Sequence, residues 1–294
     1  MISRVTASAM TQSAMRHLQA NLTQLSRLQE QATSQRAFTN PSDDPAAAAT
    51  ALQVHAQQQR NDQYARNIDD GMAWVTTVDS AISSSTSLLR RARDLTVQGA
   101  NDGALDSTAK ESIAVELEGI RDELLAQANT SLLGRSVFAG TSDAGVAFDA
   151  AFGYTGAPGS QVVRRVSDGV TVRVDADGSA VFGTGAGSVF ALLDSVVADL
   201  RSGTNVGSHL TAIDQRMTAM LGAQGAVGAR QSQIERAKEA AVDNSVSLEA
   251  RRAAVEDVDS VEVLVRLQAQ ELVYRSALAV TGRVLQPSLM DFLR

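Results

Sequence analysis

The chain has 294 residues, enough for two or three compact domains, and it contains no cysteine, which excludes disulfides and thiolate metal sites. Its formal net charge of −7 argues against nucleic acid as the main partner, because a duplex-binding surface needs a basic patch. The trio Arg90, Arg91 and Arg93 is better interpreted as a solvated helix face. No run of about 18 apolar residues occurs, so we expect no membrane-spanning segment. The N-terminus lacks the apolar core of a cleaved signal peptide.

The first predicted helix covers residues 11–32. Polar residues fill one side of it, and apolar residues recur on the other at steps of three and four, the spacing of one helix face. These apolar residues are Met15, Leu18, Leu22, Leu25, Leu28 and Ala32. We expect this face to pack against another helix.

A fixed turn follows the first helix. Pro41 and Pro45 exclude the residue before each of them from the helical conformation. Asp44 can cap the N–H groups of a new helix, and Pro45 is tolerated at the first helical position. We therefore assign Pro41, Asp43, Asp44 and Pro45 to a structural turn, rather than the two carboxylates to acid–base chemistry or to a cation.

Two more helices are predicted before the middle of the chain. The first runs from Ala46 to about Gln98, and glycines at 99 and 103 end it. The second begins near Ser107 or Thr108, where Thr108 and Glu111 match a capping box. Its apolar stripe, which fades near residue 134, consists of Ile113, Leu117, Ile120 and Leu124.

The hydrophobic period changes in the central stretch, which also holds most of the aromatic residues. Residues 161–166 and 170–174 are predicted to be strands, because valines alternate with polar residues in the second of them. Asp168–Gly169 and Asp177–Gly178 supply turn residues. Residues 180–182 are predicted to form a third strand, which completes a small β-rich insertion.

Helical patterns return at Ser188, break near residues 202–208, and then continue almost to the end of the chain. Gly222, Gly225 and Gly228 lie inside this region, and each costs about 1 kcal/mol of helix propensity relative to alanine. Two explanations are open. Either the helix is interrupted there, or the glycines permit a close approach of another backbone.

The last helical segment carries two neighbouring apolar stripes. One consists of Val258, Val261, Val265, Leu272 and Ala279, and the other of Val261, Leu264, Leu267, Tyr274, Leu278 and Leu285. A helix with one partner needs only a narrower seam, so two stripes predict burial on more than one side. Pro287 is expected to end the helix and leave a short apolar tail, residues 288–294.

These patterns predict a mainly α fold in which N- and C-terminal helices pair antiparallel in a long coiled-coil bundle, with a small β-rich domain inserted. Residues 1–45 and 250–294 would form the terminal assembly domain, 46–134 and 187–249 a helical bundle, and 135–186 an outer β-rich domain. We expect the two ends to be poorly ordered in an isolated monomer, because a lone helix pair leaves an apolar stripe in water. The predicted assembly interface consists of Leu18, Leu22, Leu25, Val261, Leu264, Val265, Leu272 and Leu278.

No catalytic, cofactor or metal site is predicted. His17, His55 and His209 are far apart in sequence, lack metal-ligand neighbours and are interpreted as solvated or partly packed helix residues. The loop Gly183–Ser188 resembles a dinucleotide-binding turn, but Ser188 replaces the third glycine and no parallel strand follows. We therefore expect a protein that is not an enzyme.

Three segments resemble the bacterial flagellin superfamily. Residues 38–47, Phe-Thr-Asn-Pro-Ser-Asp-Asp-Pro-Ala-Ala, resemble its N-terminal turn. Residues 225–235 resemble its C-terminal helical motif, in which asparagine is usual where Ser232 stands, and residues 286–293 resemble its closing sequence. Within the superfamily, the Gly134–Gly140 segment and the following Tyr154-Thr-Gly156 are most similar to the hook–filament junction group.

The resemblance implies a secreted structural subunit of the flagellum, exported unfolded by the flagellar type III apparatus. It implies assembly into a ring that joins a hook-side junction protein to flagellin, and an export chaperone that binds the C-terminal helices. A short flagellin that forms the filament itself is the main alternative. A cytoplasmic helical scaffold or signalling protein is an alternative of another class.

Overall fold

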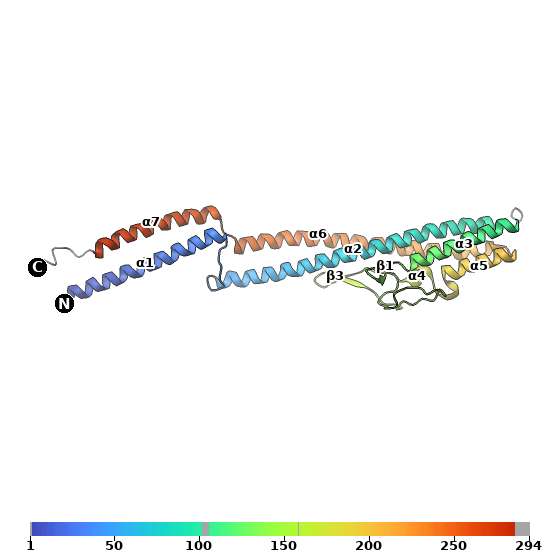
Figure 1. Cartoon of the computed structure of the whole chain (residues 1–294), viewed down its shortest axis with the longest axis horizontal. Coiled ribbons are helices and arrows are strands. Elements are labelled where there is room, and N and C mark those ends of the chain that lie inside the picture. The colour runs from blue at the N-terminus through green and yellow to red at the C-terminus, as the bar shows by residue number, and fades with distance from the viewer. Residues whose placement is uncertain (1, 102–105, 158, 286–294) are drawn as a thin grey trace. The chain divides into compact units, whose positions relative to one another are not determined.

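The computed structural model describes residues 2–101, 106–157 and 159–285 (Figure 1). Pro287, the apolar tail after it and Gly103 lie outside the described residues. In chain order the elements are α1 (Ile2–Ser34), α2 (Pro45–Gly99), α3 (Ser107–Ala128), β1 (Ser131–Leu132), β2 (Arg135–Ser136), β3 (Val163–Ser167), β4 (Val170–Arg173), α4 (Gly178–Phe182), η1 (Gly185–Gly187), α5 (Val189–Ser202), η2 (Val206–His209), α6 (Leu210–Glu256) and α7 (Ser260–Leu285). The mainly α fold with few short strands is confirmed.

The chain folds as two compact units. Unit 1 contains residues 1–60 and 245–294, and unit 2 contains residues 61–244. The contiguous apolar core consists of unit 2 residues alone. Within the described part of unit 1, the buried apolar side chains are Leu28, Ala48, Ala51, Val54, Leu248 and Val263. The division into three domains stays a prediction.

A buried position recurs every seven residues along the long helices of unit 2. In α2 these residues are Asn61, Ile68, Val75, Ile82, Leu89 and Thr96, and in α6 they are Ile213, Met220, Val227, Ile234 and Ala241. A repeat of seven is typical of helices that wind around one another in a left-handed coiled coil. Buried faces of α3 and α5 complete the same core, including the predicted stripe Ile113, Leu117, Ile120 and Leu124.

The three glycines of α6 do not interrupt it, which settles one question that the sequence leaves open. The helix runs unbroken through Gly222, Gly225 and Gly228. A Cβ atom built on any of them would meet no described atom within 4 Å. The glycines therefore do not serve a close approach within this chain.

Aspartates fix the starts of α2 and α3. Asp44 Oδ1 accepts hydrogen bonds from the N–H groups of Ala46 and Ala47, at 3.1 and 2.9 Å, and Asp43 Oδ2 accepts one from the Asn40 N–H at 3.1 Å. At α3 the predicted capping box of Thr108 is wrong. Asp106 caps this helix instead, because its Oδ1 accepts from the Ala109 N–H at 2.7 Å.

The predicted hairpin in the central stretch is confirmed, whereas the third strand is wrong. β3 and β4 pair antiparallel, with Val163 opposite Arg173, and Gly169 turns between them at a φ of +70°. Residues 180–182 belong to the short helix α4. Asp177 caps that helix by accepting from the Ser179 N–H at 2.9 Å, and this cap outweighs the β propensity of a short apolar run.

Aromatic rings form the centre of the core beneath this segment. Phe148 contacts Phe190, Tyr154 and Phe182 with ring centroids 5.2, 5.3 and 5.8 Å apart. Burial raises the pKa of Tyr154 to about 12, and its hydroxyl donates to the Phe138 carbonyl at 3.0 Å. The aromatic residues that mark the central stretch in the sequence therefore hold it against the helices.

The long C-terminal helical region is divided in two, at a break that the sequence pattern does not indicate. α6 ends at Glu256 and α7 begins at Ser260. Asp259 caps α7 by accepting from the N–H groups of Val261 and Glu262, at 2.9 and 3.2 Å. Val258, expected in an apolar stripe, lies in the break and donates its N–H to the Gln35 carbonyl at 3.3 Å.

Candidate assembly interface

α1 and α7 pack side by side in unit 1 (Figure 1). Near the middle of the pair, Gln270 Nε2 donates to the Asn21 carbonyl at 3.3 Å. Just beyond the end of α1 and before the start of α7, Arg36 forms a β-bridge with Asp257. Residue numbers rise along α1 as they fall along α7, so the two chain ends run antiparallel, as predicted.

A narrow seam joins these two helices. On α7 the seam contains Val263, which is 5% exposed, and the partly buried Leu267, Gln270 and Tyr274. On α1 it contains Leu28, also 5% exposed, and the partly buried Leu18, Asn21 and Leu25. Two of the predicted interface residues, Leu18 and Leu25, therefore lie against the chain's own α7.

The other predicted interface residues lie on exposed faces. Val261 and Leu272 are 73% and 67% exposed. At 3.6 residues per turn, Val265 and Leu272 lie on the side of α7 opposite Val263. We call the exposed apolar residues of α7 the outer face: Val261, Leu264, Val265, Leu272, Val273, Leu278 and Val280. Leu22 of α1 is exposed as well. This pair thus leaves apolar surface without an intramolecular partner in the described chain, and such surface marks sites of protein contact.

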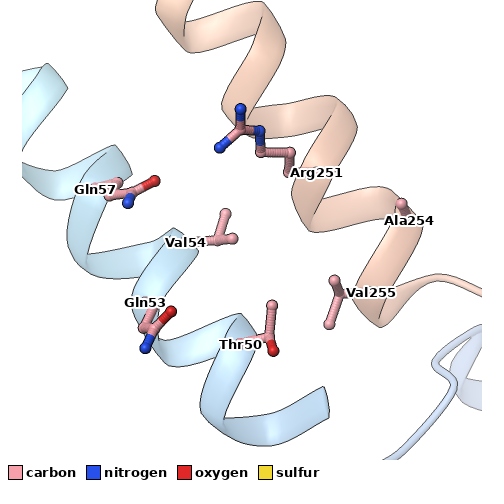
Figure 2. A pocket seen from close by; sticks show the side chains of 7 residues that line it. All are labelled: Thr50, Gln53, Val54, Gln57, Arg251, Ala254 and Val255. Atoms are coloured by element: carbon pink, nitrogen blue, oxygen red, sulfur yellow. The ribbon is translucent and has the colours of Figure 1, made fainter. Parts of the chain in front are cut away.

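A shallow groove lies between the start of α2 and the end of α6, in the same unit. Figure 2 shows Val54 and Val255 on its two walls, with Arg251 and glutamines around them. Its volume is about 260 Å³. Ligand pockets usually enclose about 300–1,000 Å³, so the groove gives no support for a cofactor.

A polar cluster ties together the segments at the α6–α7 break. His55 Nε2 lies 2.5 Å from Glu256 Oε1, and Glu256 is only 9% exposed. Arg252 contacts the carboxylates of Glu249, Glu256 and Asp257 at 2.8, 3.4 and 2.9 Å. Its hydrogen bond lowers the pKa of the Glu249 carboxyl. No local sequence pattern predicts this cluster, because 201 residues separate His55 from Glu256.

The other candidate sites have structural explanations. His209 bonds Asp199 at 2.7 Å within unit 2. The loop Gly183–Ser188 contains a 3-10 turn, and Ser188 Oγ caps α5 by accepting from the Ala191 N–H at 3.2 Å. Both sheets of the described chain are antiparallel. Among the described residues, no three or more His, Cys, Asp and Glu side chains group as potential metal ligands, and no helix is long and apolar enough to cross a membrane.

Family models match both ends of the chain. The bacterial flagellin N-terminal helical region matches residues 5–143, and the flagellin C-terminal helical region matches residues 210–293. The chain is 32% identical over 197 residues to flagellar hook-associated protein 3 of Salmonella typhimurium, covering 61% of this chain and 62% of that protein. It is 30% identical over 217 residues to the same protein of Escherichia coli, covering 68% and 67%.

Two further comparisons concern the fold and the main alternative. The crystal structure of Bacillus cereus FlgL matches with a TM-score of 0.60 at 22% identity, covering 68% of this chain and 99% of that one. A flagellin of Halalkalibacterium halodurans is 24% identical over 280 residues, covering 92% of each chain. The chain therefore shares its fold with the Bacillus cereus protein.

Proposed function

Since the chain belongs to the flagellar hook-associated protein 3 family of the flagellin superfamily, we propose that it is a structural subunit of the bacterial flagellum, at the junction of hook and filament. It acts as an adapter and not as an enzyme. The chain matches only 62% of the length of the Salmonella protein and 67% of the length of the Escherichia protein. The function at the junction is therefore proposed by similarity to these two proteins.

The observation that carries the proposal is the outer face of α7. Its apolar side chains lie in water in the free chain, with Val261 and Leu272 more than half exposed. Burying each such side chain is worth about 1.5–3 kcal/mol. Because the α1–α7 pair covers only one side of α7, contacts with neighbouring subunits supply the remaining burial.

In the proposed junction, the chain has three kinds of neighbour. Copies of the chain contact one another in a ring, with a hook-side junction protein of the hook-associated protein 1 type below and flagellin above. The α1–α7 pair holds together in the free chain, but its exposed apolar residues are buried only when neighbouring subunits cover them. Before secretion to the extracellular flagellum, an export chaperone covers the apolar C-terminal helices.

A short flagellin is the second candidate, and the alignment with a flagellin over 92% of the chain favours it. The two functions differ in where the protein lies. An adapter occupies one short zone between hook and filament, whereas a flagellin extends along the whole filament.

Labelled antibody on isolated hook–filament structures separates these candidates. We expect the label in one narrow band at the boundary between hook and filament. Label along the filament would instead identify a flagellin. Label confined to the cytosol, in cells with or without flagella, would overturn both and support the scaffold alternative.

A further inference from the structure

The shallow groove between α2 and α6 combines apolar walls with a positive charge. Val54 and Val255 lie on its two walls, and Figure 2 shows the Arg251 side chain extending from α6 toward α2. An engineered cavity of about 150 Å³ accepts benzene, so a groove of about 260 Å³ has room for one phenyl ring. The groove therefore suits one large apolar side chain with a negative charge beside it.

Arg251 is exposed, and no carboxylate of the described chain forms an ion pair with it. The next residue differs in this respect, because Arg252 contacts the carboxylates of Glu249, Glu256 and Asp257. An acidic group that enters the groove can therefore pair with Arg251 without displacing another carboxylate.

The sequence after α7 carries the matching pair of groups. Residues 286–294, which we call the tail, lie outside the described residues and have the sequence Gln-Pro-Ser-Leu-Met-Asp-Phe-Leu-Arg. Phe292 directly follows Asp291, and leucines at 289 and 293 flank the two residues. The tail therefore offers an aromatic ring next to a carboxylate, as the groove requires.

A chain cannot place its own Phe292 in its own groove. The groove lies beside the last turns of α6, just before the start of α7. α7 has 26 residues, so its far end is about 38 Å from its start, and it packs along α1 rather than along α2 or α6. From Leu285 to Phe292 the chain spans at most about 25 Å when fully extended. The tail is therefore too short to return, and a tail in the groove comes from another copy.

We propose that the groove receives the tail of a second copy of this chain, with Phe292 between Val54 and Val255 and Asp291 paired with Arg251. Tail and groove are different surfaces, so the contact is head-to-tail, the kind that generates a ring when the rotation closes. One apolar anchor and one exposed ion pair bind weakly, so dilute free chains stay apart. In the proposed assembly, on which this inference rests, neighbours are held close and the high effective concentration of the tail lets the contact form.

Fluorescence anisotropy of a labelled peptide of residues 286–294, titrated with the full-length chain, tests the contact without any assembly step. We expect saturable binding with a dissociation constant between micromolar and millimolar. An F292A peptide should bind at least about tenfold more weakly, because the apolar anchor is lost.

A charge swap tests the pairing of Asp291 with Arg251. The R251E chain should bind the natural peptide about fivefold more weakly, and a D291R peptide should recover the lost affinity with this variant. R236E is the matched control, because it reverses an exposed charge of α6 that does not line the groove, and its binding should be unchanged. Helical circular dichroism shows whether each variant is folded.

Two results with the peptide would overturn the inference. One is the absence of binding. The other is equal binding to the unmodified chain and to A254F, in which an added ring fills the groove from an exposed position of α6.

Disulfide cross-linking identifies the source of the tail, because the natural chain has no cysteine. Junctions that contain both T50C and L293C subunits should give a covalent dimer. No dimer, or a link within single chains that carry both cysteines, would overturn the origin of the tail in a second copy. The junction assignment would survive either failure, because antibody labelling tests it separately.

Discussion

Asn61 places a buried amide in the seven-residue repeat of α2. Its side chain is 8% exposed, and Nδ2 donates to the Ala241 carbonyl of α6 at 2.9 Å. A polar residue in an otherwise apolar seam is satisfied in only one alignment of the two helices. In coiled coils such residues fix the register at some cost in stability. We infer that Asn61 specifies how α2 and α6 align within unit 2.

A single-residue prediction concerns the start of α3. The D106A variant removes the carboxylate that accepts from the Ala109 N–H and should destabilise unit 2 by about 1 kcal/mol. Urea unfolding followed by Trp74 fluorescence measures this change. T108A is the matched control, because Thr108 is exposed and its side chain does not cap the helix. Equal destabilisation by both variants would contradict the assignment of Asp106 as the cap.

Among the elements, α7 differs from the helices of unit 2 in having two apolar sides. One side packs on α1 through Val263 and Leu267, and the outer face covers the rest of the helix surface, with Leu272 opposite Val263. The two sides therefore have different roles in the free chain and in an assembly. Seam residues hold the pair together in the free chain, whereas outer-face residues contribute nothing to it and are available to a neighbour.

Two charge substitutions in α7 separate these sides. L272D places a charge on the exposed outer face, so the free chain should keep its helical circular dichroism while the cells lose normal swimming. V263D places the charge in the seam, where a buried unpaired charge is costly, and should lower the helical signal of the free chain itself. Normal swimming by the L272D strain, with the variant present at the junction, would refute the interface assignment.

The sequence predicts the long helices but not the break between α6 and α7, and the reason is physical. Periodicity located every long helix, because each buries a continuous face. It missed the α6–α7 break, since Val258, Val261 and Val265 continue the apolar repeat across it. Asp259 with Glu262 three residues later is the capping signature that marks the true start of α7.

Other features depend on contacts that no local pattern records. The α7 seam includes the polar Gln270 beside Leu267 and Tyr274, so the apolar stripes mixed seam residues with exposed ones. The bond between His55 and Glu256 joins residues 201 positions apart. The apolar stripes therefore predicted an interface on α7, and the structure was needed to show which side of α7 the chain covers itself.

At the scale of the whole molecule, the two units differ in how completely they bury their own apolar surface. Unit 2 has a contiguous core with an aromatic centre. Unit 1 buries few apolar side chains in its described part and exposes the outer face of α7. Unit 2 therefore buries most of its own apolar surface, and we expect unit 1 to gain its remaining burial from other subunits. This difference is the central claim of the assembly model.

Thiol labelling tests this claim most directly, because the natural chain has no cysteine. L272C places a thiol on the outer face, and V263C places one in the seam as a control that should stay unreactive. We predict that L272C reacts rapidly with a maleimide dye in the free chain and is protected in isolated hook–filament junctions. Equal reactivity of L272C in both states would contradict the claim that neighbouring subunits bury the outer face.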